Sequence, residues 1–261
     1  MFKSFIRLLH YLNLDCVFGI WLAYNWVQLW VSPSIKEGFC FTLLIAVWTI
    51  YSLDRMIDGV FRSSDQLRDI HLFHQRHSMK FIIGMGGCCT WLLFWISLHP
   101  QYLLLTMFLT IFTICSIVLG QFSNELIKII KNSLVSFIIV FGISLQIWIY
   151  KSYNTEVTVG LFIVYLLTAM NLTMTDIIHS EDKNKSFSVA MVYMLMTGVL
   201  ILAIYMMITG YWIQGFMVVM NGIGHRILIK SRMYGFDKKI CAEWLWNFTF
   251  MVMILSFAFD G

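Results

Sequence analysis

Two carboxylates, Asp54 and Asp58, follow closely on the strongly apolar run 39–50. Residues four apart lie on one face of a helix, so these side chains would be neighbours. Two like charges at the edge of hydrocarbon repel each other unless a cation lies between them. A hard divalent ion such as Mg²⁺, usually shared with substrate phosphates, would relieve that repulsion. The motif predicts either a metal–diphosphate site or an interfacial salt-bridge cluster with a nearby base: Arg55, Arg62 or Lys80.

A second group of chemically capable side chains follows the apolar run 157–176. Steps of three residues place Asp176, His179 and Asp182 on one broad helical face, whereas Glu181 suits a solvated loop start. Two acid clusters facing each other would each hold a divalent ion on one diphosphate. Asn171, one and a half turns earlier, would either line the cavity beside this cluster or join two helices.

A basic, histidine-rich segment lies between the first acid pair and the next apolar run. His71, His74 and His77 recur every three residues, so they would share a helix face. Neutral imidazoles bind transition metals, but membrane di-iron enzymes need several such clusters. The favoured interpretation is contact with phosphate or with anionic lipid headgroups by the arginines of this segment: Arg62, Arg68 and Arg76.

The elements that position these groups are membrane helices. The chain is 59% hydrophobic and 12% charged, whereas a soluble domain carries about 25% charged residues. Nine runs approach the length needed to cross about 30 Å of hydrocarbon. They cover residues 15–33, 38–56, 79–98, 101–119, 132–150, 157–176, 187–208, 210–227 and 242–259. Residues 1–14 form either an interfacial amphipathic helix or an extension of the first run.

The distribution of basic residues predicts the orientation. With the N-terminus in the cytosol, 16 of the 18 Lys and Arg residues fall on the cytosolic side. Only Lys36 and Lys151 remain opposite, so the positive-inside rule favours N-in, C-out. The acid motifs would then face the cytosol, in an inner or plasma membrane if the chain is bacterial. The predicted cytosolic loops are at about 57–78, 120–131, 177–186 and 228–241.

Several function classes lack support. There is no Walker loop, dinucleotide-binding fingerprint, nucleophile elbow or triad spacing, and nothing indicates nucleic-acid binding. The six cysteines mostly lie within apolar runs and form no CxxC pair, so they are read as small core residues. Without a linker or low-complexity tract, residues 1–261 are expected to form a single transmembrane domain.

The two acid segments together resemble the UbiA superfamily of intramembrane prenyltransferases. That family has nine spans and a motif N-D-x-x-D-x-x-x-D after the second span, of which the segment from Asp54 to Asp58 matches the last five positions. The segment from Asp176 to Asp182 resembles the second family motif. The leading Asn and Asp fall at Ile50 and Tyr51, and Ile178 stands where a carboxylate is expected.

The resemblance implies an all-α bundle of nine helices around a central cavity. It implies Mg²⁺-dependent transfer of an isoprenyl group from its diphosphate to a small, often aromatic, acceptor within membrane lipid. The implied catalytic and metal-binding residues are Asp54, Asp58, Asp176 and Asp182. Substrate contacts are expected from Arg62, Arg68, Asn171, Tyr51 and His179. Aromatic faces would stabilise an allylic cation; the candidates are Trp21, Tyr24, Trp48 and Tyr51.

Other functions remain open at this stage. A non-catalytic prenyl-lipid-binding or assembly protein on the same fold is favoured by the residues at Ile50 and Tyr51 and opposed by the four retained aspartates. A small-solute transporter ranks lower, because its key charges would be expected near the middle of the membrane rather than at the ends of spans. A histidine-rich membrane oxidoreductase ranks last.

Overall fold

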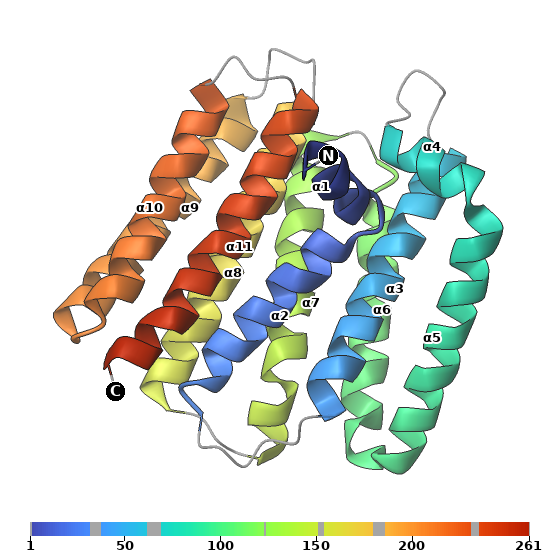
Figure 1. The fold of residues 1–261 in the computed structure, drawn as a ribbon, viewed down its shortest axis with the longest axis horizontal. Coiled ribbons are helices and arrows are strands. Elements are labelled where there is room, and N and C mark those ends of the chain that lie inside the picture. Colours follow the sequence, from blue (N-terminus) through green and yellow to red (C-terminus); the bar gives the residue numbers. More distant parts are fainter. Residues whose placement is uncertain are drawn as a thin grey trace. The chain divides into compact units, whose positions relative to one another are not determined.

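A computed structural model describes residues 2–31, 38–61, 69–122, 124–150, 154–179, 186–230 and 235–260. Helices make up the regular structure of these ranges, and no strand occurs in them (Figure 1). The all-α prediction is therefore confirmed for the described part of the chain.

Each of the nine predicted apolar runs coincides with a described helix. They are α2 (Leu14–Gln28), α3 (Gly38–Phe61), α5 (Ser78–Leu98), α6 (Leu103–Leu119), α7 (Glu125–Tyr150), α8 (Thr155–His179), α9 (Ser186–Ile208), α10 (Trp212–Lys230) and α11 (Gly235–Asp260). The predicted amphipathic segment at the N-terminus is α1 (Phe2–Tyr11). Helix periodicity and hydrophobicity along the sequence were sufficient to locate these elements.

Six of the described helices are long and apolar enough to cross a membrane: α3, α5, α6 with its preceding turn, α7, α8 and α9. A seventh span results if α1 and α2, which meet at an angle of 81°, count as one broken span. In α10 the apolar run is interrupted by buried polar side chains such as Gln214 and His225. In α11 the apolar part covers only Ile240–Ser256. The chain is thus a multi-pass membrane protein by helix length and composition.

The chain forms two compact units, and each is described by itself. The first comprises Met1–Trp21 and Ile35–Lys131. It contains α1, α3, α5, α6, the 3-10 turn η2 (Pro100–Tyr102) and the short helix α4 (Asp69–Arg76), which packs against α1, α3 and α5. α4 lies inside the predicted loop 57–78, and α3 extends into that loop as far as Phe61. The first acid pair therefore lies within the last two turns of a helix.

A buried polar corner joins α1 to α2 within the first unit. Asn13, at the corner, has φ 57°, a left-handed conformation that Asn tolerates better than most residues. Its side-chain amide lies 3.3 Å from both Ser52 Oγ on α3 and His74 Nε2 on α4. His10 Nδ1 and Asp15 Oδ2, on either side of the corner, are 2.6 Å apart. These contacts fix the corner against the same end of α3 that carries the acids.

The second unit comprises Leu22–Ser34 and Asn132–Gly261. In this unit α9 packs against α8 and α10, while α11 packs against α8 and α10. Among the six apolar helices, α8 has the largest buried share. Its fully buried side chains include Ile163, Leu167, Met170 and Met174. The second acid motif therefore begins at the end of the central helix of this unit.

Candidate functional site

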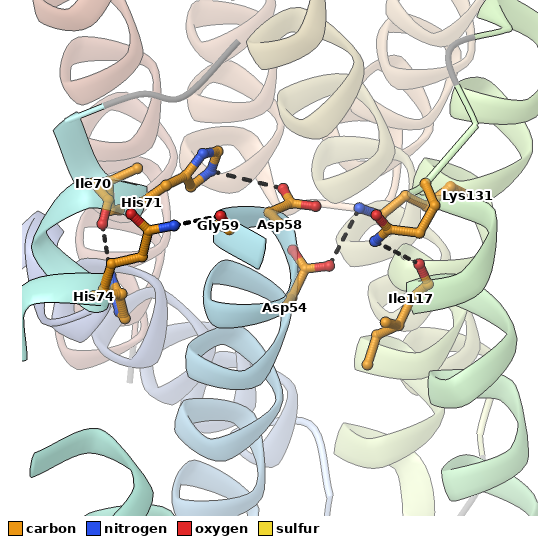
Figure 2. A network of polar contacts seen from close by, with 10 residues as sticks. Asp54, Asp58, Gly59, Ile70, His71, His74, Ile117 and Lys131 are labelled. Atoms are coloured by element: carbon orange, nitrogen blue, oxygen red, sulfur yellow. Dashed lines mark hydrogen bonds and ion pairs between the residues drawn. The ribbon is translucent and has the colours of Figure 1, made fainter. Parts of the chain in front are cut away.

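Asp54 faces a lysine that lies 77 residues away in the sequence. Asp54 Oδ1 and Lys131 Nζ, at the start of α7, are 3.4 Å apart (Figure 2). Both side chains are partly accessible, at 21% and 17%. The lysine reaches this position by passing over Gly120, where a Cβ atom would lie 2.7 Å from Nζ. A glycine at this position thus leaves room for an ammonium group beside Asp54.

Asp58 follows one turn later on the same face of α3, as the spacing predicts. It is 2% exposed, and its Oδ2 lies 3.7 Å from Nε2 of the fully buried His71 on α4. That distance permits an ion pair but exceeds a direct hydrogen bond. Gln75 of α4 donates a hydrogen bond from Nε2 to the backbone oxygen of Gly59. α4 is thereby attached to α3 one residue beyond the buried carboxylate (Figure 2).

His74 connects α4 to the α1–α2 corner. Its Nδ1–H donates to the Ile70 oxygen at 2.8 Å, because a carbonyl can only accept. In the neutral ring Nε2 is then the acceptor for the Asn13 amide. The ring also stacks on Phe81, with centroids 4.2 Å apart. Burial lowers the pKa of His74, and the charge of Arg55 lowers it further against the opposing effect of the Ile70 bond. This histidine is therefore a neutral structural group at pH 7.

In the second unit, Asp176 is bound by an amide. Asn132 of α7 donates from Nδ2 to Asp176 Oδ2 at 2.8 Å, and the asparagine is only 6% exposed. Ser136, one turn further along α7, donates to the backbone oxygen of Asn132. The carboxylate of Asp176 is thus oriented by a neutral hydrogen-bond donor from a neighbouring helix.

Asn171 joins helices. Its side-chain amide lies 3.3 Å from Nε2 of His225 on α10, a fully buried side chain, and donates to this ring nitrogen because His225 Nδ1 carries the ring proton. His225 Nδ1–H donates to the Asn221 oxygen at 2.9 Å, and the Asn221 amide donates to Thr249 Oγ1 of α11 at 2.8 Å. This chain of bonds links α8, α10 and α11. Of the two predicted roles for Asn171, the structure supports the helix-joining one.

The structure describes some of the remaining predicted site residues and not others. Tyr51 lies half-buried on α3. Asp182, Arg62 and Arg68 lie outside the described residues, as does the side chain of His179, the last residue of α8. The structure brings Asp54 and Asp58 together on one helix in the first unit. Asp176 and Asn171 lie in the second unit, five residues apart on α8.

The donors of the first unit suit a Mg²⁺ ion. Over the described ranges, no group of three or more His, Cys, Asp and Glu side chains is placed to hold a metal. Mg²⁺ in phosphate-transferring sites, however, commonly uses only one or two carboxylates plus substrate oxygens. Asp54 and Asp58 supply two, and the Lys131 ammonium already occupies a cation position beside one of them. Asp54 and Asp58 therefore provide the one or two carboxylates that a phosphate-bound Mg²⁺ ion commonly uses.

Three contributors were missing from the sequence-based site. Lys131 and Asn132 were assigned to the end of a loop and the start of a span, and His71 to a basic loop. The histidine spacing did predict a shared helix face, and α4 confirms a helix for His71 and His74. No local pattern marks Lys131 or Asn132, since their partners lie 77 and 44 residues away.

Comparison with known proteins identifies no relative: no protein-family model, curated protein or solved structure matches this chain.

Proposed function

We propose that this protein is an intramembrane prenyltransferase of the UbiA type. It would transfer an isoprenyl group from its diphosphate to a small, often aromatic, acceptor. The observation that carries the proposal is the Asp54–Asp58 pair at the end of an apolar helix, with the Lys131 ammonium 3.4 Å from Asp54. Carboxylates that bind a divalent ion, next to a lysine that binds phosphate, are the groups that recognise a metal diphosphate.

Each predicted site residue named below has a specific role in this proposal. Asp54 and Asp58 would hold one Mg²⁺ ion, and the predicted acids of the second motif, Asp176 and, outside the described ranges, Asp182, would hold another. When bound, Mg²⁺ would neutralise the charge that develops on the departing diphosphate. Lys131 would move from Asp54 to a diphosphate oxygen as the substrate enters. Arg62 and Arg68 would donate further hydrogen bonds to the same group, and Tyr51 would border the isoprenyl chain.

The proposal includes a topology of nine spans with the N-terminus in the cytosol. It adds α10 and α11 to the apolar helices, and counts α2 as a span of its own. Buried polar side chains are tolerated in membrane helices when other helices satisfy them. The bonds of Asn221 and His225 to α11 and α8 meet that condition. The acid-bearing ends of α3 and α8 would then face the cytosol, as the distribution of Lys and Arg predicts.

A second candidate is a non-catalytic protein that binds a prenyl lipid on the same fold. It is favoured by the pairing of both carboxylates with the chain's own bases, Asp54 with Lys131 and Asp58 with His71. Such pairs balance the acids without a metal. They would make the cluster a structural junction, and the lipid tail would be the only ligand.

A transfer assay separates these two candidates. The purified protein in detergent would be incubated with labelled isoprenyl diphosphates of graded length and a membrane lipid extract as the source of acceptor. The enzyme proposal predicts release of inorganic pyrophosphate and a labelled, extractable product, both abolished by EDTA. Binding of the labelled donor without pyrophosphate release at any chain length would instead favour the non-catalytic protein.

A further inference from the structure

The short helix α4 brings a histidine to Asp58, the most buried proposed metal ligand among the described residues. Asp58 is 2% exposed and His71 is 0% exposed. A carboxylate removed from water is costly unless polar or charged groups compensate it. His71 Nε2, 3.7 Å from Asp58 Oδ2, is such a group and comes from a separate helix. The direction in which this carboxylate points therefore depends on where α4 lies.

The position of α4 is itself fixed at two points. Gln75 donates to the Gly59 oxygen, and a Cβ atom at residue 59 would lie 3.2 Å from the Gln75 side chain. Glycine therefore permits this close approach between α3 and α4. On the other side, His74 contacts the Asn13 amide of the α1–α2 corner. These attachments leave His71 little freedom to move away from Asp58.

We propose that His71 is a positioning residue for metal binding, which orients the Asp58 carboxylate toward the ion without contacting the ion itself. This inference rests on the proposed function. The imidazole faces Oδ2 and so limits the rotation of the carboxylate. Groups that orient a metal ligand from the second layer typically contribute about 10- to 100-fold to metal affinity. The whole of α4 thus serves to fix one ligand.

The test is a Mg²⁺ titration of the full-length protein in detergent at saturating farnesyl diphosphate. The measured quantity is the half-saturating Mg²⁺ concentration, at which the midpoint temperature of thermal unfolding has risen by half of its full Mg²⁺-dependent increase. Two variants of similar side-chain volume are compared: His71→Gln keeps a polar side chain at this position, and His71→Leu replaces it with an apolar one. We expect His71→Leu to raise the half-saturating Mg²⁺ concentration by about 10- to 100-fold. His71→Gln should stay within a few-fold of the wild type.

Equal half-saturating concentrations for both variants would overturn the inference, because packing alone would then explain the residue. A wild-type value in His71→Leu would also overturn it. If His71→Leu does not fold, the exposed position Gln75 is used instead. Gln75→Met removes the bond to Gly59, and an unchanged half-saturating Mg²⁺ concentration in that variant would contradict a positioning role for α4. Absence of any Mg²⁺-dependent stabilisation in the wild type would instead refute the proposed function.

Discussion

The carboxylates of the two units are stabilised in different ways. In the first unit Asp54 lies beside an ammonium group and Asp58, one turn later on α3, lies beside an imidazole. In the second unit Asp176 accepts a hydrogen bond from the neutral amide of Asn132. The first arrangement places a basic side chain beside each acid, whereas the second places a neutral amide that fixes the direction of the carboxylate.

This difference has a chemical consequence. A lysine that neutralises a carboxylate competes with an incoming metal ion, but it can then bind the phosphate that arrives with the metal. An amide does not compete with a cation, so under the proposed function Asp176 would not have to exchange its partner when a metal ion binds. We therefore expect ligand binding to depend on charge in the first unit, and protein stability to depend on hydrogen bonding in the second.

Removal of the lysine charge should have the largest effect. Lys131→Met is expected to raise the half-saturating concentration of an isoprenyl diphosphate by roughly 10- to 100-fold, the equivalent of one hydrogen bond to a charged group. The measurement is a thermal-stability titration with the diphosphate at fixed Mg²⁺. Lys128→Met, one turn earlier on α7, is the control and should bind like the wild type. Equal loss in both variants would mean that general surface charge is responsible.

The corresponding change in the second unit, removal of the Asn132 amide, should lower the stability of the protein. Asn132→Ala removes the donor to Asp176 and leaves a half-buried carboxylate less satisfied. The free energy of unfolding should fall by about 1–3 kcal/mol, measured by denaturant titration in detergent. Asn132→Ala in an Asp176→Ala background, where the carboxylate partner is absent, is the comparison. If Asn132→Ala lowers the free energy of unfolding equally in both backgrounds, the amide bond to Asp176 contributes little to stability.

These contrasts show where sequence-based prediction succeeds and where it ends. Apolar runs predicted the positions of the nine long helices described by the structure, because hydrophobic length is a local property. The short helix α4 was missed as an element, although the spacing of its histidines predicted their shared face. Its stability comes from packing on α3 and from the bond between Gln75 and Gly59, neither of which appears in the local sequence.

The candidate site likewise contains residues that the sequence predicted and residues that it did not. The acids were found because carboxylates at the end of an apolar run are unusual. Lys131 was not found, since its role depends on the space beside Gly120 and on Asp54, which lies 77 residues away in the sequence. Asn13 was also missed, because its left-handed conformation and its two partners become apparent only in the folded corner.

A smaller effect on diphosphate binding should follow from placing a methyl group in the space beside Gly120. Gly120→Ala is compatible with the backbone, at φ −63°, but its Cβ would displace the end of the Lys131 side chain. Because lysine is flexible, we expect diphosphate affinity to fall only a few-fold, less than in Lys131→Met. The same titration measures it. If Gly120→Ala weakened binding more than Lys131→Met, the glycine would serve a role other than making room for the lysine.

The smallest effect concerns pH and α4. The pKa of His74 is lower in the folded protein than in the unfolded chain. The unfolded chain therefore binds a proton more readily, and stability should decrease as the pH falls below about 6.5 toward the folded-state pKa. The comparison is unfolding of wild type and His74→Gln between pH 8 and pH 5. The wild type should lose more stability than the variant over this range, and parallel curves would exclude His74 as the source.

The most direct test of the account is the thermal stability of the purified protein with isoprenyl diphosphates of graded length, with and without Mg²⁺. Each titration is repeated on Asp54→Asn, which keeps the size of the side chain and removes its charge. A metal–diphosphate site at Asp54 predicts stabilisation that requires both Mg²⁺ and the diphosphate and that disappears in Asp54→Asn. Stabilisation that is independent of Mg²⁺, or that persists in Asp54→Asn, would contradict the central claim that this carboxylate belongs to a metal–diphosphate site.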